Sequence, residues 1–148
     1  MKRLLSSMTL VMLMIGCTSG EEGTVITVDP STVEPLEELP EDIVDTHGEI
    51  TNLEQLEEFI QKVEVFEPDS VRIISYTTEG DPIVKEVEFT GELFEITYDT
   101  RRDGFGSQVI RNYTCTAIDR EETQSSVTFK FTGCEGEQDS IVLLDLPN

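Results

Sequence analysis

The chain has 148 residues, and its 31 Asp and Glu against ten Lys and Arg give a formal net charge of −21 at pH 7. A surface this acidic argues against a nucleic-acid partner, which needs clustered Lys and Arg, and against flat docking on an anionic membrane, which attracts basic segments. The charge is compatible with solubility alone, with a bound cation, or with a cationic protein partner.

Residues 1–16 predict a secretory signal peptide. Lys2-Arg3 precedes an apolar run from Leu4 to Ile15, which is shorter than the roughly 20 residues of a membrane-spanning helix. Cys17 directly follows the small residue Gly16, a layout that resembles the lipobox of bacterial lipoproteins. We therefore expect cleavage before Cys17 and acylation of its thiol with a diacylglyceryl group carrying chains such as palmitate. Such a protein is exported and anchored at the outer face of the cell membrane; a plain signal peptide with an incidental cysteine is the alternative.

Residues 17–46 predict an acidic, disordered tether. No Lys or Arg occurs between Leu4 and Gln61, and three prolines interrupt the stretch. Such a segment buries too little apolar surface to offset its chain entropy, and self-repulsion extends it. We expect it to lift the domain off the bilayer. Within it, Val25–Val28 has the composition of an edge strand, which is the alternative for those four residues.

Residues 47–148 predict a single domain that begins with one helix. The Thr51–Glu54 segment fits a capping box, in which the Thr hydroxyl and the Glu carboxylate satisfy free backbone donors. An apolar stripe at helical spacing follows, and Pro68 sets the limit for the end of the helix. The stripe comprises Leu53, Leu56, Phe59, Ile60 and Val63.

The rest of the domain reads as strands. Glu79–Pro82 and Gly91 mark turns, and residues 101–107 form a loop. These breaks predict an α+β fold in which the helix packs on one face of an antiparallel meander of about five to six strands. The segments with strand composition are 71–77, 83–90, 92–99, 110–122, 127–134 and 140–146.

Cys115 and Cys134 are predicted to form a disulfide bond. If the last hairpin turns at Gln124-Ser125, Asp119 faces Lys130, Ile118 faces Phe131, and the two thiols face each other. The oxidising environment of an exported protein favours the bond. A longer loop would instead place Cys134 opposite Ile110, and two inert thiols are the other alternative.

The sequence contains none of the common catalytic signatures. His47 is the only histidine, and beside Gly48 in a loop it is expected to be solvated or to cap a turn. No GxSxG, HExxH or phosphate-loop pattern is present. A Ser-His-Asp triad cannot be assigned, because His47 is the only candidate for its base. There is no CxxC pair, so a redox role is not expected. We therefore predict no enzymatic activity and no cofactor.

Asp99–Gly104 resembles a calcium loop, but Arg101 stands where an oxygen ligand is needed, so no metal site is predicted. Arg101 and Arg102 either pair with neighbouring carboxylates or contact an anion. The oxygen-rich segment Tyr76–Pro82 is interpreted as turn chemistry, with a ligand site as the alternative.

Three functions are compatible with these features. The first is a lipid-anchored, non-catalytic binding or accessory module that contacts the membrane through its N-terminal acyl chains. The second is a cation-binding envelope protein, favoured by the negative charge. The third is a hydrolase that uses paired carboxylates, for which acid pairs such as Glu57/Glu58 and Glu121/Glu122 are candidates.

Tyr76–Ile83 is the most specific of several stretches in which the domain resembles a family of small firmicute lipoproteins that carry a domain of unknown function. The resemblance covers about 90 residues. It implies no activity and no catalytic residue, but it agrees with the anchor, the exported location and the paired cysteines. The matching stretches are His47–Glu54 with the helix after it, Val71–Ile83, Tyr98-Asp99, Thr114-Cys115 and Gly133-Cys134.

Overall fold

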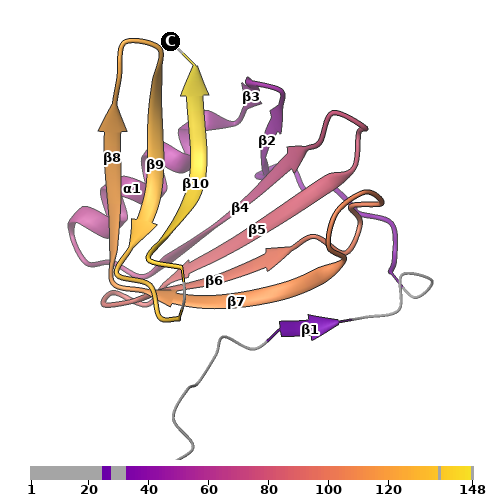
Figure 1. The fold of residues 1–148 in the computed structure, drawn as a ribbon. Coiled ribbons are helices and arrows are strands. Elements are labelled where there is room, and N and C mark those ends of the chain that lie inside the picture. The colour runs from indigo at the N-terminus through magenta and orange to yellow at the C-terminus, as the bar shows by residue number, and fades with distance from the viewer. Residues whose placement is uncertain (1–24, 28–32, 137, 148) are drawn as a thin grey trace, which may run out of the picture.

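The computed structural model describes residues 25–27, 33–136 and 138–147, and it arranges them as one helix and ten strands in two sheets (Figure 1). The predicted signal peptide, Cys17 and most of the residues between Cys17 and Thr32 lie outside these described residues. The elements are β1 (Val25–Thr27), β2 (Ile43–Thr46), β3 (Glu49–Thr51), α1 (Leu53–Glu64), β4 (Asp69–Tyr76), β5 (Pro82–Phe89), β6 (Phe94–Asp99), β7 (Val109–Cys115), β8 (Ala117–Glu122), β9 (Ser126–Thr132) and β10 (Ser140–Pro147).

The large sheet has the strand order β1-β7-β6-β5-β4-β2-β3. Its central part, β4 to β7, is the antiparallel meander that the alternating residues predict. The prediction of a purely antiparallel sheet is wrong, because β2 pairs in parallel with β4, with Ile43 opposite Ile73. The chain reaches β4 from β2 through β3 and α1, and a parallel pairing needs a crossover of this kind.

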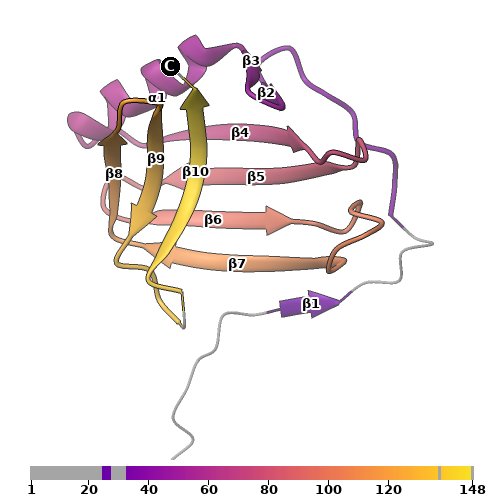
Figure 2. The same cartoon turned by 45° about the horizontal axis from the view of Figure 1, so that its top comes forward.

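A small sheet with the order β10-β9-β8 forms a second layer, which corrects the prediction of one sheet with five to six strands. The predicted strand 110–122 is two strands, β7 and β8, that bend at Thr116 and leave one sheet for the other. At the bend, the Thr116 amide donates to the Thr132 carbonyl at 3.2 Å. In Figure 2 the strands of the small sheet run across those of the large sheet.

The core lies between the large sheet, α1 and the small sheet, and it centres on Phe94 of β6. The Phe94 ring stacks on Phe89 with a centroid distance of 4.7 Å, lies 5.0 Å from Phe131 of β9, and meets the edge of Phe59 of α1 at 6.5 Å. All four rings are at most 3 % exposed. We call the side of the large sheet that carries Phe94 the inner face, and the opposite side the outer face.

The helix begins one residue later than the capping box predicts. Thr51 pairs with Val44 in the β2–β3 ladder, and Asn52 is the N-cap, with φ 55° and no capping hydrogen bond from its side chain. The side-chain amide of Asn52 instead donates to the backbone carbonyls of Pro40 at 3.0 Å and Asp42 at 2.7 Å. Tertiary contacts with the preceding segment therefore override the local capping signal. The end of the helix at Glu64, before Pro68, agrees with the prediction.

The folded domain begins before His47, so the predicted tether is too long at its C-terminal end. Ile43 is fully buried in the core, and β2 is part of the large sheet. Residues 34–42 lie against the outer face, where the Arg102 Nε donates to the Glu34 carbonyl at 3.1 Å and the Tyr76 hydroxyl donates to the Glu38 carboxylate. Polar side chains of the sheet and of the loop after β6 thus bind the backbone and a carboxylate of a segment that has no cation of its own.

The short strand β1 pairs with β7 at the edge of the large sheet, as Figure 1 shows. This pairing matches the edge-strand alternative for the Val25–Val28 stretch rather than a fully disordered tether. Residues 17–24 and 28–32 of the predicted tether lie outside the described ranges.

Candidate functional site

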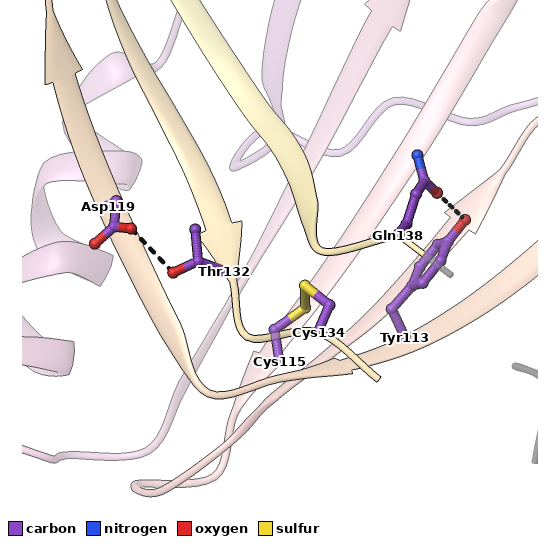
Figure 3. The surroundings of a disulfide bond; sticks show 6 residues. All are labelled: Tyr113, Cys115, Asp119, Thr132, Cys134 and Gln138. Carbon is purple, nitrogen blue, oxygen red and sulfur yellow. Dashed lines mark hydrogen bonds between the residues drawn. A yellow bond between two sulfur atoms is a disulfide. The ribbon is translucent and has the colours of Figure 1, made fainter. Parts of the chain in front are cut away.

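A disulfide bond between Cys115 and Cys134 joins the large sheet to the small sheet (Figure 3). Cys115 ends β7 and is fully buried, and Cys134 follows β9. The register behind the prediction is confirmed, since Ile118 pairs with Phe131 and the Thr123 amide donates to the Ser126 carbonyl at 2.8 Å across the two-residue turn. The structure therefore rejects both the longer loop and the free thiols.

A pocket of about 550 Å³ lies between the inner face of the large sheet and the start of β10. Lys85 of β5, Tyr98 of β6 and Arg111 of β7 stand in one row, because the register places Lys85 opposite Tyr98 and Tyr98 opposite Arg111. The start of β10 and the residues before it form the other wall. The pocket is lined by Lys85, Tyr98, Arg111, Tyr113, Gln138, Ser140, Ile141 and Val142.

The disulfide holds one wall of this inner-face pocket in place. Tyr113 lies two residues before Cys115, and Gln138 lies four residues after Cys134. The Tyr113 hydroxyl donates to the Gln138 side-chain oxygen at 3.1 Å, and Figure 3 shows this pair beside the two sulfur atoms. The covalent link therefore positions the two walls relative to each other.

The basic residues of the described ranges that form no ion pair both line the inner-face pocket. Lys2 and Arg3 lie outside the described residues, which leaves eight basic side chains. Six of these form ion pairs with carboxylates, and among the described residues only Lys85 and Arg111 do not. The six paired residues are Lys62, Arg72, Arg101, Arg102, Arg120 and Lys130.

Lys85 is held at a position that disfavours its charge. Its Nζ donates to the Leu143 carbonyl at 2.9 Å and lies 5.9 Å from the centroid of the Tyr98 ring. Burial lowers the pKa of Lys85 to about 8, although the nearby Asp45 carboxylate acts in the opposite direction. Burial also raises the pKa of Tyr98, so its hydroxyl stays protonated and able to donate at neutral pH.

Replacing Lys85 with methionine is expected to stabilise the domain by about 1–2 kcal/mol at pH 7. The lowered pKa corresponds to roughly 3 kcal/mol, from which the lost hydrogen bond to Leu143 subtracts about 1 kcal/mol. Between pH 8 and 10.5 the unfolded chain holds the Lys85 proton and the native chain does not, so wild-type stability rises with pH in that window. Urea unfolding near pH 7 and near pH 9.5 measures both effects.

The advantage of Lys85→Met over the wild type should therefore shrink at the higher pH. Lys62→Met is the matched control, because the Lys62 side chain is 42 % exposed and pairs with Asp69 at the surface. We expect it to change stability by less than about 1 kcal/mol. If the Lys85→Met protein were less stable than the wild type at pH 7, the conclusion that the fold holds the Lys85 charge at an unfavourable position would be wrong.

A second pocket, of about 430 Å³, includes outer-face residues and the fully buried Asp42. Asp42 Oδ2 accepts from the Arg72 Nη1 at 2.8 Å and from the Leu39 amide at 2.7 Å, whereas its Oδ1 has no partner among the described residues. Glu88 and Glu95 stand directly opposite each other on neighbouring strands, an arrangement that is unfavourable for like charges. The lining of this second pocket is therefore mainly acidic, whereas the inner-face pocket has two basic side chains.

The predicted pairing of Arg101 and Arg102 with carboxylates is confirmed. The Arg101 Nη2 and the Arg102 Nη1 donate to Asp99 Oδ2 at 2.6 Å and 3.0 Å. Burial alone would raise the pKa of Asp99, but the hydrogen bonds from Arg101 outweigh it and hold that pKa below its ordinary value. Asp103 Oδ1 accepts from the amides of Phe105 and Gly106, so both aspartates of the calcium-like loop are engaged internally.

The other candidate residues occupy turns and solvated faces. His47 and Gly48 form the two-residue turn between β2 and β3, with φ values of 57° and 91° as a type I′ turn requires. In the Tyr76–Pro82 turn the Asp81 amide donates to the Thr77 hydroxyl at 3.1 Å, which is turn chemistry. Glu57 and Glu58 are exposed on α1.

Within the residues that the structure covers, no group of three His, Cys, Asp or Glu is arranged to hold a metal ion. The helix α1 is also too short and too polar to span a membrane, and the described ranges contain no other helix that would. Cys17, the predicted lipidation site, lies outside these ranges.

The sequence did not identify the four inner-face pocket residues on the large sheet. Lys85, Tyr98, Arg111 and Tyr113 are spread over three strands and look like ordinary sheet positions. One available signal was that Lys85 and Val87 share the inward side of β5, so a cation occupies a position where the pattern calls for an apolar residue. Only the cross-strand register shows that these residues meet.

Comparison with known proteins gives one match. A family model for a domain of unknown function, DUF4362, matches residues 40–130, which extend from just before β2 into β9. Neither the curated proteins nor the solved structures contain a match to the chain. The matched region includes Lys85, Tyr98, Arg111 and Tyr113, whereas Gln138 and the start of β10 follow it. Because the match covers more than half of its 148 residues, the chain belongs to the DUF4362 family of domains of unknown function.

Proposed function

We propose that this protein is an exported, lipid-anchored binding module without catalytic activity, and that the inner-face pocket is its binding site. The observation that carries the binding role is the placement of Lys85 and Arg111. In a chain with a net charge of −21, the two cations of the described part that lack a carboxylate partner line the same pocket. A role in stability alone would favour pairing them, as the other six are paired.

The anchor is supported by the N-terminal sequence. A basic start, a short apolar run and a cysteine after a small residue together match the signal of a lipidated export substrate. Removal of residues 1–16 takes away Lys2 and Arg3 and no acid, so the formal charge changes from −21 to −23. Two acyl chains attached through Cys17 are sufficient for a stable anchor, where a single chain is not.

The Cys115–Cys134 disulfide supports the exported location. Disulfide bonds persist in oxidising compartments and are rare where thiol reductants are abundant. Here the bond lies at the corner between the two sheets and beside the inner-face pocket. Export thus supplies the condition under which the walls of the pocket are held together.

The side chains in the pocket support binding rather than catalysis. The pocket is lined by two cations, two phenols, one amide and one hydroxyl, together with two apolar side chains. His47 lies in the turn between β2 and β3 and is not one of the lining residues. These groups can orient and neutralise a ligand, whereas Ser140 has no histidine beside it to activate its hydroxyl.

Mass spectrometry of the protein extracted from membranes tests the anchor. We expect the chain to begin at Cys17, with the mass of a diacylglyceryl group added and the mass of residues 1–16 lost. The Cys17→Ser variant should retain its leader and carry no lipid, because it has no thiol to acylate. A wild-type protein that still holds its first 16 residues, or has an unmodified Cys17, would contradict the proposal.

A further inference from the structure

We propose that the inner-face pocket binds the oxyanion group of a ligand, a phosphate or a carboxylate, between Lys85 and Arg111, with Tyr98 and Tyr113 contacting the body of the ligand. This inference rests on the proposed function and deepens it by naming the class of ligand. It concerns described residues only, and it is independent of how the N-terminus is processed.

The first argument is the geometry of the two cations. Lys85 and Arg111 lie in one cross-strand row with Tyr98 between them. Neighbouring strands are about 4.8 Å apart, so the two backbones are separated by roughly 10 Å. Both side chains are long enough to converge on one anion above the Tyr98 ring. The arginine fork offers a planar pair of donors and the lysine a compact charge, which together suit an oxyanion.

The second argument is the unused donor capacity of these cations. An ammonium group has three N–H donors, and Lys85 uses one of them for the Leu143 carbonyl at 2.9 Å. Asp45 is the carboxylate that acts on Lys85 electrostatically, but its Oδ1 already accepts from the Gly48 amide at 2.8 Å. Arg111 forms no ion pair with any described residue. An anionic ligand would supply the close ion pair that Lys85 and Arg111 do not make with any described residue.

The third argument concerns the rest of the lining. Two phenol rings give flat apolar contact area, while the Tyr113 hydroxyl is already oriented by Gln138 at 3.1 Å (Figure 3). Ile141 and Val142 add apolar surface on the opposite wall, and the Val142 side chain is half exposed. A ligand that carries an oxyanion on a ring or chain would therefore be contacted at both ends.

The strong negative charge of the protein does not prevent this binding. Charges on the surface are screened beyond about 8 Å at physiological ionic strength, whereas groups in direct contact inside a partly buried pocket are screened much less. The outer-face carboxylates lie on the opposite side of the sheet from Lys85 and Arg111. Local contacts therefore decide the sign of the interaction.

Tyrosine fluorescence reports directly on this pocket. The chain has no Trp and three Tyr, two of which line the pocket, and the third is Tyr76 on the outer face. In a Tyr76→Phe background all tyrosine emission comes from the proposed site. The full-length protein, extracted from membranes into a detergent with a neutral headgroup, is titrated with inorganic phosphate, glucuronate and glucose, and calorimetry repeats each titration.

We expect saturable binding of phosphate, glucuronate or both, with a dissociation constant of about 1 mM, and none of glucose. Lys85→Gln and Arg111→Gln should each weaken binding at least about tenfold, whereas the surface control Lys62→Gln should not change it. Thermal melts of each variant establish that it is folded. A response to phosphate alone assigns a phosphate ligand, and a response to glucuronate alone assigns a carboxylate.

Three results would overturn the inference: no saturable response to either anion, equal binding by the pocket variants and Lys62→Gln, or equal binding of glucose and glucuronate. The last of these would leave the pocket as a binding site for uncharged ligands, so the proposed function would stand. A failure of the anchor appears only in the mass of the N-terminus and leaves the titration unaffected.

Discussion

Replacing Asp42 with alanine is expected to lower the free energy of unfolding by about 3 kcal/mol. Asp42 is fully buried, and one of its oxygens accepts from both Arg72 and the Leu39 amide. Its loss leaves the partly buried Arg72 without its close counter-charge and releases the segment before β2 from the outer face. Urea unfolding at neutral pH measures the effect.

Glu86→Gln provides the matched control, since it removes the other acidic partner of the same arginine. The Glu86 side chain is 61 % exposed, and its carboxylate lies 3.5 Å from the Arg72 Nε. An exposed pair contributes little, so we expect a change below about 1 kcal/mol. Equal losses in the two variants would show that burial of Asp42 does not determine its contribution.

Removing the disulfide with the double substitution Cys115→Ala and Cys134→Ala is expected to cost about 3 kcal/mol. The bond closes a loop with a sequence separation of 19, and the chain-entropy account gives this magnitude for a loop of that size. For a domain of about 110 residues the melting temperature should fall by roughly 10–20 °C. Calorimetry of the variant and the wild type makes the comparison.

Reduction of the wild-type protein separates the covalent effect from the packing effect. Reduced wild type keeps the buried Cys115 side chain, so it should lose slightly less stability than the double variant. Cys17→Ser retains the Cys115–Cys134 bond and should melt like the wild type. If reduction left the melting temperature of the wild type unchanged, the bond would not be constraining the unfolded chain as we expect.

The cations on the two faces of the large sheet have different partners, and this difference connects stability to function. On the outer face, Arg72 and Arg102 bind the acidic segment that precedes β2. On the inner face, Lys85 and Arg111 form no ion pair with any described residue, and they line one pocket between the large sheet and β10. A site that holds a side chain in a charge state or position that burial disfavours lowers the stability of the fold, and such sites are often functional. Lys85 fits that description on the inner face.

Several features followed from local sequence rules. The register of β8 and β9 was predictable, because a two-residue turn leaves one alignment that pairs Ile118 with Phe131 and the two cysteines. The apolar stripe of α1 identified Leu56 and Phe59, both of which are buried. The pairing of Arg101 with Asp99 was predictable as well, because the residues are two positions apart in a tight loop.

Other features depended on contacts between distant segments. The bend at Thr116 carries no proline or glycine, so residues 110–122 read as one strand in the sequence. The parallel pairing of β2 with β4 brings Ile43 beside Ile73, 30 residues away, and no local rule relates them. The cap at Asn52 and the position of residues 34–42 likewise rest on partners far along the chain.

By itself the sequence determined the single helix, the central meander, the hairpin register and the cysteine pair, because each arises from neighbouring residues or from one short turn. Only the tertiary structure decided that the strands divide into two sheets, that the acidic segment joins the fold, and that Lys85 and Arg111 share a pocket. The physical reason is that alternation along a strand specifies which face a side chain occupies, whereas the neighbours on that face come from other strands.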